Sequence, residues 1–389
     1  MSFSAGRACI AVAALLGVSA CHGVSSVPST APAEPSTRQS APFSARTTPV
    51  DTTSILKKLT KDVLIGSTVD PGNGNKGPRG ATFVNAGYGE LKTGQVLVCN
   101  NENSAGDPGK GTTVEKLGPD PGKPVRFLQS TKIEGCTDLS LSPASDDLYV
   151  AAPDADLIAQ ISPKGKMLKS WSKQLKDPFS VVDGACVGGA SKCGYAAEYV
   201  YAGDAETGGI VSFSVNYYGN KTPTEVASGF AVNHKTGWSA LGPSGLAFNS
   251  SKKGTLYIAD GVDNTVVYFF NATELLIPDE IEVLKGGKTF KCKYKNSTCG
   301  ILVHAGAPLD APVAMTLLPN GNLIVANTGG TSPNTLVEMT TTGTVLATKV
   351  VDKSKTAGIF GIRAVGTDDD NTALYYTDTN DNSLHKLEQ

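Results

Sequence analysis

The stretch GTLYIADGVDNTVVYFF, Gly254 to Phe270, decides the fold. Two runs of β-branched, aliphatic and aromatic residues flank a short turn that contains Asp and Asn. Such runs favour strands, and such a turn favours a tight antiparallel connection between them. The same arrangement of an apolar run, a polar turn and a second apolar run recurs along the chain. Six copies begin at Val96, Leu148, Tyr199, Leu256, Leu323 and Leu374.

The spacing of these copies indicates a repeated structural unit. Aligned on their fifth residue, the copies lie 51 to 67 residues apart. A further apolar run precedes each copy through a short turn, and a fourth strand-like segment usually follows. Four antiparallel strands in a unit of about 50 residues form one blade of a propeller. The sequence therefore predicts an all-β fold, a six-bladed β-propeller of residues 55–389. The blades are predicted at about residues 78–131, 132–174, 177–230, 241–290, 303–352 and 358–389 plus 62–69.

The ring needs a strand from the start of the chain to complete its last blade. The sixth copy ends at Gln389, just after its third strand. The run DVLIGSTV, Asp62 to Val69, is strand-like and belongs to no copy. We predict that it forms the outer strand of the last blade, because closure removes a free sheet edge. Two insertions, residues 183–196 and 271–304, are predicted to stand off the ring as hairpin flaps.

The N-terminal region is predicted to be an export and anchoring segment. Residues 1–20 contain a short apolar run after Arg7, too short to span a bilayer and typical of a signal peptide. The residues VSAC, ending at Cys21, resemble a bacterial lipoprotein signal, which implies acylation of Cys21 and attachment to a membrane. Residues 21–54 are rich in Pro, Ser and Thr and are predicted to be a disordered tether.

Six further cysteines fit an exported chain with disulfides. An even number of cysteines in such a chain favours disulfide bonds. Two pairs, in CVGGASKC and CKYKNSTC, could each close a small loop, and this leaves one pair between distant cysteines. Zinc is disfavoured because neither spacing is C-x2-C and no His lies nearby. The predicted disulfides are Cys99–Cys136, Cys186–Cys193 and Cys292–Cys299.

The composition excludes a nucleic-acid binder. The chain has 34 Lys and Arg against 36 Asp and Glu, and no basic cluster stands out. A nucleic-acid-binding face needs an excess of positive charge. Only 18% of the residues are charged and 43 are Gly, which suits a turn-rich β protein.

The recurring acidic turn has a structural explanation. Asp260, Asn327 and Asp378 occupy the position where the second strand of a unit ends. Asp and Asn side chains accept hydrogen bonds from backbone two residues on and so stabilise turns. Recurrence from blade to blade favours this role, although the same residues remain candidates for ligand binding.

The copies GNLIVANTGGTSPNTLVEM and GTLYIADGVDNTVVYF resemble NHL repeats and the six-bladed class around them. The resemblance covers about residues 62–389. This class includes gluconolactonase-like lactonases, streptogramin lyases, an amidating lyase and plain binding modules, so the fold does not choose the function. The resemblance to the lactonases implies a divalent ion held by a Glu, two Asn and an Asp near the inner strands.

Two sets of residues are candidates for chemistry. Asp138 is the acidic residue in the predicted inner strands, and the Glu that the lactonases need there is missing. An oxygen-rich cation site could form from Asn100, Asn101, Glu102 and Asp138. The lyases of the class need His; His234 and His304 each precede a predicted inner strand, so they could meet at the channel mouth as an acid–base pair. The alternative is two ordinary loop histidines.

The sequence favours a binding protein over an enzyme. We predict a lipid-anchored extracytoplasmic propeller that binds a small ligand or an envelope protein at the channel mouth, as a monomer and without a cofactor or metal. A lactonase-like hydrolase or lyase is the alternative. Four aromatic residues are candidates for a contact surface: Tyr217, Tyr218, Trp238 and Tyr294.

Overall fold

Long apolar runs in this chain become strands that are buried on both faces. The computed structural model describes residues 50–184, 198–215, 222–251 and 253–389. The strand Leu148–Ala152, for example, is buried at every position. A strand whose two faces both pack against other sheets does not alternate apolar and polar residues. The continuous apolar runs therefore indicate sheets stacked face to face.

The described strands form six antiparallel meanders, one per blade. Blade 1 contains β2 (Lys76–Phe83), β3 (Val96–Glu102), β4 (Pro108–Leu117) and β5 (Val125–Gln129). Blade 2 contains β6 (Asp138–Leu141), β7 (Leu148–Ala152), β8 (Leu157–Ile161) and β9 (Met167–Trp171). Blade 3 contains β10 (Pro178–Asp183), β11 (Glu198–Asp204), β12 (Gly209–Val215) and β13 (Thr224–Ser228), extended by β17 (Ile281–Leu284) and β18 (Thr289–Cys292).

The second half of the chain forms the other three blades. Blade 4 contains β14 (Pro243–Asn249), β15 (Thr255–Asp260), β16 (Thr265–Phe270) and β19 (Cys299–Ala305). Blade 5 contains β20 (Pro312–Leu317), β21 (Leu323–Asn327), β22 (Thr335–Met339) and β23 (Val345–Val350). Blade 6 contains β24 (Ile362–Val365), β25 (Ala373–Asp378), β26 (Ser383–Glu388) and β1 (Lys61–Ser67). The short 3-10 helices are η1 (Thr131–Ile133), η2 (Pro153–Ala155), η3 (Gly237–Ser239) and η4 (Ala272–Glu274).

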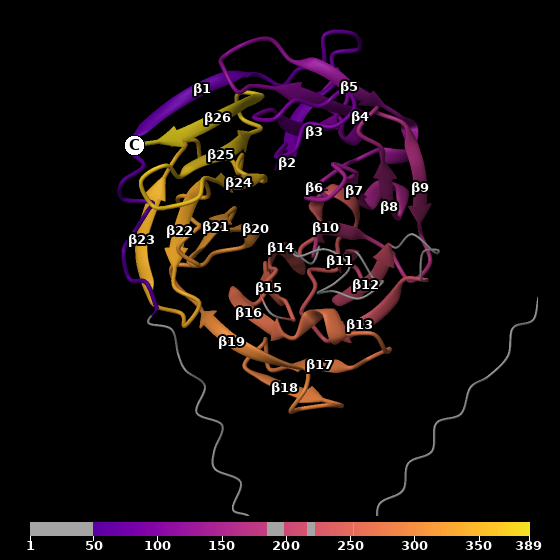
Figure 1. The fold of residues 1–389 in the computed structure, drawn as a ribbon, viewed down its shortest axis with the longest axis vertical. Coiled ribbons are helices and arrows are strands. Elements are labelled where there is room, and N and C mark those ends of the chain that lie inside the picture. Colours follow the sequence, from indigo (N-terminus) through magenta and orange to yellow (C-terminus); the bar gives the residue numbers. More distant parts are fainter. Residues whose placement is uncertain (1–49, 185–197, 216–221, 252) are drawn as a thin grey trace, which may run out of the picture. The chain divides into compact units, whose positions relative to one another are not determined.

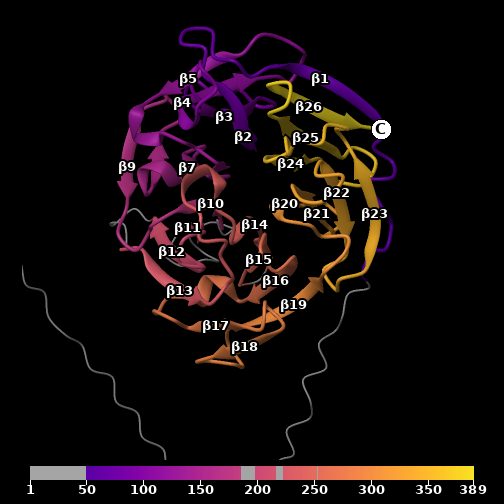
Figure 2. The same cartoon turned by 180° about the vertical axis from the view of Figure 1, so that it is seen from behind.

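The six sheets form a closed ring with the first strand of each meander nearest the axis (Figure 1). Each inner strand contacts the inner strand of the next blade, and β24 contacts β2. The view from behind gives the same order around the ring (Figure 2). The fold is a six-bladed β-propeller, as the sequence predicts.

The hydrophobic core is divided into layers between neighbouring blades. One cluster, for example, joins Leu97 of blade 1 to Val150 of blade 2, and another joins Ile324 of blade 5 to Tyr376 of blade 6. Similar clusters lie at the other four interfaces. No blade can bury its apolar faces alone, so the ring is the unit that folds.

The predicted closure of the last blade is confirmed. β1 pairs antiparallel with β26, from Lys61 opposite Glu388 to Ser67 opposite Ser383. Side chains reinforce this junction: Tyr376 donates a hydrogen bond of 2.6 Å to Asp62, and a ring nitrogen of His385 lies 3.2 Å from the same carboxylate. His385 also stacks on Tyr376. Two strands from opposite ends of the chain thus share one sheet.

A turn before β1 ties the N-terminal segment to blade 5. Glu338 on β22 is fully buried and accepts hydrogen bonds from the Ser54 hydroxyl at 2.6 Å, the Ile55 N–H at 3.0 Å and the Leu56 N–H at 2.9 Å. Ile55, Leu56 and Leu59 join the core layer between blades 5 and 6. Within the described residues, no helix is long and apolar enough to cross a membrane.

The flap predicted for residues 271–304 is wrong. β17 pairs in parallel with β13, and β18 pairs with β17, so this hairpin extends the sheet of blade 3. The remaining strand, β19, pairs with β16 as the fourth strand of blade 4, beyond the predicted limit of that blade at residue 290. A predicted disulfide, Cys292–Cys299, links β18 to β19. Residues 185–197, with the predicted pair Cys186–Cys193, lie outside the described residues.

Removing β1 should destabilise the whole ring. A chain that begins at Thr68 loses the strand and exposes the layer that Ile65, which is 2% exposed, helps to fill. Loss of one buried aliphatic side chain of this size costs about 2–5 kcal/mol, and each kcal/mol shifts the Tm of a large domain by about 2 °C. We expect the Tm to fall by at least about 5 °C in calorimetry.

The matched control for this truncation is a chain that begins at Lys61. It lacks the turn before β1 but keeps the strand itself. Equal Tm values for the two truncated chains would contradict a latching role for β1.

Candidate functional site

The inner strands approach one another closely at the axis, and short polar side chains hold them together. The Ser140 hydroxyl on β6 accepts a hydrogen bond of 2.9 Å from the Asp183 N–H on β10. The Thr316 hydroxyl on β20 likewise accepts one of 3.1 Å from the Ala364 N–H on β24. These bonds connect blade 2 to blade 3 and blade 5 to blade 6.

An axial cavity of about 240 Å³ lies where the inner strands end. Every blade contributes to its wall, either from its inner strand or from the residues just after it. Representative wall residues, one per blade, are Asn85, Ser140, Asp183, Phe248, Thr316 and Arg363. Asn85 and Pro143 at the rim are exposed, so the cavity opens to solvent at this end of the axis. A narrow continuation of about 20 Å³, also lined by Ser140 and Arg363, runs toward the strand starts.

Arg363 on β24 is the cationic residue in the wall of the axial cavity. Within the described residues, its guanidinium forms no hydrogen bond or ion pair. Burial lowers the pKa of Arg363, and the carboxylates of Asp138 and Asp183 oppose that shift. An arginine remains charged even so. The cavity therefore contains a guanidinium whose donors are available to solvent or to a ligand.

Asp138 lies at the narrow end of the cavity, at the start of β6. Its carboxylate accepts hydrogen bonds from the Leu139 N–H at 2.8 Å and the Val181 N–H at 2.9 Å. Burial raises the pKa of Asp138 to about 7, although both hydrogen bonds and Arg363 oppose the rise. Asp138 thus joins blade 2 to blade 3 and lines the site at the same time.

The opposite end of the axis is filled by side chains. Arg79 on β2 is 6% exposed and donates a hydrogen bond of 3.0 Å to the Trp238 carbonyl oxygen in η3. Its guanidinium lies 5.6 Å from the Trp238 ring centre and 3.9 Å from that of Phe360. Burial lowers the pKa of Arg79 to about 10, and Glu102 and Asp154 oppose this shift. Contacts among blades 1, 4 and 6 therefore close this end.

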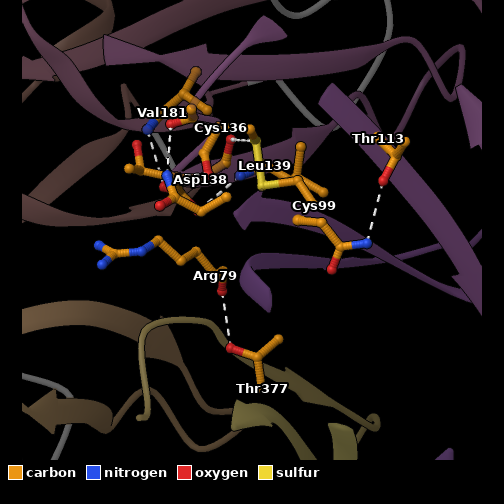
Figure 3. The surroundings of a disulfide bond; sticks show 12 residues. Arg79, Cys99, Thr113, Cys136, Asp138, Leu139, Val181 and Thr377 are labelled. Atoms are coloured by element: carbon orange, nitrogen blue, oxygen red, sulfur yellow. Dashed lines mark hydrogen bonds between the residues drawn. A yellow bond between two sulfur atoms is a disulfide. The ribbon is translucent and has the colours of Figure 1, made fainter. Parts of the chain in front are cut away.

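The disulfide Cys99–Cys136 holds the wall beside Asp138 (Figure 3). Cys99 is on β3, and Cys136 lies two residues before Asp138. The bond was one of the predicted pairs. It fixes the loop that leads into β6 against blade 1. Figure 3 also shows Thr377 donating to the Arg79 carbonyl oxygen, a bond of 2.9 Å between blades 6 and 1.

Comparison with known proteins shows the fold. No protein-family model and no curated protein sequence matches this chain. Among solved structures, a gluconolactonase from Xanthomonas campestris is 10% identical with a TM-score of 0.52, over 84% of this chain and 89% of that one. A structural genomics protein of unknown function from Bacteroides thetaiotaomicron is 12% identical with a TM-score of 0.50, over 84% and 74%.

A chain in a nidogen–laminin complex is 14% identical with a TM-score of 0.50, over 75% of this chain and 86% of that one. These three structures come from a lactonase, an uncharacterised protein and a protein–protein complex. At such low identity the likeness shows the β-propeller fold alone, and the same fold serves unrelated functions.

The predicted cation ligands Asn100 and Asn101 have structural partners. The Asn100 amide donates to the Thr68 carbonyl oxygen at 2.8 Å, which fixes the segment after β1. The Asn101 amide donates to the Gly135 carbonyl oxygen at 2.9 Å and accepts the Gly109 N–H at 3.1 Å. No group of three or more acidic, His or Cys side chains suited to a metal ion occurs among the described residues.

The turn residues have the predicted structural role in two of three cases. The Asp260 carboxylate accepts the N–H two residues on at 2.9 Å, and Asp378 does the same at 2.8 Å. Burial raises the pKa of each to about 6. Asn327 instead donates to the Pro308 carbonyl oxygen at 2.7 Å. In blade 3 the role belongs to Asp204, one residue after the aligned position.

The predicted histidine pair at the channel mouth is wrong. His304 is on β19, the outermost strand of blade 4, and its ring nitrogens lie 3.0 Å from the Gly343 carbonyl oxygen and 3.1 Å from that of Ala307. His234 lies in the exposed loop before η3. The chain segment before β20 contains β19, so preceding an inner strand in sequence does not place a residue at the axis.

Of the aromatic residues predicted to form a contact surface, the two that the structure describes do not lie together. Trp238 is 41% exposed and covers Arg79, whereas Tyr294, which is 55% exposed, lies in the turn between β18 and β19. Tyr217 and Tyr218 fall outside the described residues. Arg363 is a site residue that was not predicted, although a cationic residue in the inner-strand run FGIRAV was the available signal.

Gly80→Ala tests the close approach of blades 1 and 2 at the axis. A Cβ at Gly80 would lie 2.5 Å from the Cα of Asp138, so the two inner strands would have to move apart. We expect the free energy of unfolding to fall by about 1–3 kcal/mol or more in denaturant titrations. Gly122→Ala is the control, because its nearest neighbouring atom is 3.8 Å away. A Gly80→Ala protein as stable as Gly122→Ala would refute the close approach.

Proposed function

We propose that this chain is an exported, membrane-anchored binding propeller that holds a small ligand in its axial cavity. The observation that carries the proposal is the cavity itself: it is open at one end and filled at the other by Arg79 and Trp238, and its wall contains the Arg363 guanidinium, which has no hydrogen-bond partner among the described residues. Ligand sites are concave, with a few polar groups among apolar ones. Leu246, Met315 and Phe248 supply the apolar part here.

The proposed location rests on the cysteines. The two disulfides in the described residues fit an oxidising compartment outside the cytoplasm. The lipoprotein-like sequence that ends at Cys21, followed by the Pro-, Ser- and Thr-rich segment to residue 54, supports a lipid anchor with a tether. The NHL-like pattern of blades 4 and 5 supports membership of a broad propeller class in which ligand and partner binding are common.

Occlusion of the mouth should abolish ligand binding. Ser250 lines the cavity directly after β14, so Ser250→Trp would place a large ring at the opening. A thermal-shift screen against small carboxylic acids, amides, amines and polyols would find hits with the wild-type protein. We expect every hit to be lost in Ser250→Trp and kept in Ser251→Trp, the neighbouring exposed residue. Hits that persist in Ser250→Trp would place binding elsewhere.

Replacement of Cys21 should release the protein from the membrane. A thiol is required for acylation, so Cys21→Ser in the full chain should move the protein from the membrane fraction to the soluble extracytoplasmic fraction. Labelling with a radioactive fatty acid measures the modification directly. Wild-type protein without label, or membrane-bound Cys21→Ser, would contradict the anchor.

A lactonase-like hydrolase or lyase is the second candidate function. This chain shares the propeller fold with a gluconolactonase over 84% of its length. Turnover of aldonolactones by the wild-type protein, lost in Asp138→Asn, would support an enzyme with its site in the axial cavity. Binding of ligand without turnover would support the binding propeller.

A further inference from the structure

Resting on the proposed function, we infer that the axial cavity selects a small ligand with a single carboxylate, which Arg363 binds. A guanidinium carries five N–H donors in a planar fork that matches the two oxygens of a carboxylate. Within the described residues, none of the Arg363 side-chain donors has a protein acceptor. A charge withdrawn from solvent needs such partners to offset its desolvation. The cavity next to it is where an anionic partner fits.

Two hydroxyl groups in the same wall add donors. The Ser140 and Thr316 oxygens each accept a backbone N–H, from Asp183 and Ala364 respectively. A hydroxyl that accepts one hydrogen bond still has its own proton to donate. Both residues line the cavity together with Arg363. Three side chains from blades 2, 5 and 6 therefore place donors in the wall of one cavity.

The nearby carboxylates limit the charge of the ligand. Asp183 lines the cavity, and Asp138 lines its narrow continuation. Each opposes the lowering of the pKa of Arg363, so each lies within electrostatic range of the guanidinium. A dianionic phosphate would be repelled by them more strongly than a monoanion. Hence a single carboxylate fits this wall better than a phosphate.

The apolar part of the cavity wall fits a ligand whose remaining portion is apolar and small. Leu246 and Met315 are each 6% exposed, and Phe248 lies beside them in the wall. The volume of about 240 Å³ is below the range of about 300–1,000 Å³ typical of drug-sized ligands. The ligand class is thus a small monocarboxylic acid with an apolar group.

Four probes of one size test this selectivity: phenylacetate, its neutral amide phenylacetamide, the dianion phenylphosphonate, and 2-phenylethylamine. Dissociation constants would be measured by ligand-observed NMR with the folded wild-type protein at mildly alkaline pH, where phenylphosphonate is a dianion and phenylacetate a monoanion. We expect phenylacetate to bind at least about tenfold more tightly than each of the other three, because it alone offers two acceptors and one negative charge.

Variants at Arg363 assign the effect to the guanidinium. Arg363→Met should remove the preference for phenylacetate over phenylacetamide, and Arg363→Lys should retain only part of it because the planar fork is lost. Lys353→Met removes an exposed positive charge from the connection between β23 and β24 and should change nothing. Tm values of all three variants check that they fold.

The outcomes separate this inference from the proposed function. Equal binding of phenylacetate and phenylacetamide, or a preference that survives in Arg363→Met, would overturn the carboxylate inference. If phenylacetamide or the amine binds best and Ser250→Trp abolishes that binding, the cavity is still a ligand site and only the ligand class is wrong. If no probe and no hit from the wider screen depends on Ser250, both conclusions fail.

Discussion

The close approach of six inner strands at one axis is the constraint on which the rest of this structure depends. At Gly361 a Cβ would lie 2.0 Å from the Arg79 carbonyl oxygen, so the backbones of blades 6 and 1 meet without an intervening side chain. Where a side chain does intervene it is short and polar: the Ser180 hydroxyl on β10 donates to the Pro243 carbonyl oxygen on β14 at 3.1 Å. Such bonds replace the ladder that separate sheets lack. They fix the positions of the wall residues.

Closure transmits this constraint around the ring. Each core layer lies between two blades, so every blade is stabilised by both of its neighbours. The last blade is complete only when β1 pairs with β26. The turn at Ile55 and Leu56 adds a second junction, because buried Glu338 would lose three hydrogen bonds if that turn detached. A buried carboxylate without partners costs several kcal/mol. The walls of the axial cavity are therefore held in place by the closed ring.

Sequence periodicity predicted the fold because each blade repeats one local pattern, and it predicted β1 because the last unit lacked a strand. Periodicity did not predict pairings between strands that are distant in the chain. The parallel pairing of β17 with β13 joins segments separated in the chain by three strands of blade 4, and no turn or periodicity signals such a pair. His304 was misplaced for the same reason. Asp138 was found because an acidic residue in an inner strand is conspicuous, whereas Asp183 was missed at the last position of β10.

The two arginines on the axis show why residue type alone cannot identify the site. Arg79 and Arg363 both belong to inner strands, and burial lowers the pKa of both. The Arg79 guanidinium has partners within the protein. Phe360 and Trp238 contact it, and the Trp238 carbonyl oxygen accepts a hydrogen bond from it. Such an arginine fills space and joins blades. Within the described residues, the Arg363 guanidinium has no hydrogen-bond acceptor and lines the cavity, with Asp138 and Asp183 within electrostatic range. The position of a guanidinium in the cavity wall, and not its residue type, is therefore what distinguishes Arg363 from Arg79.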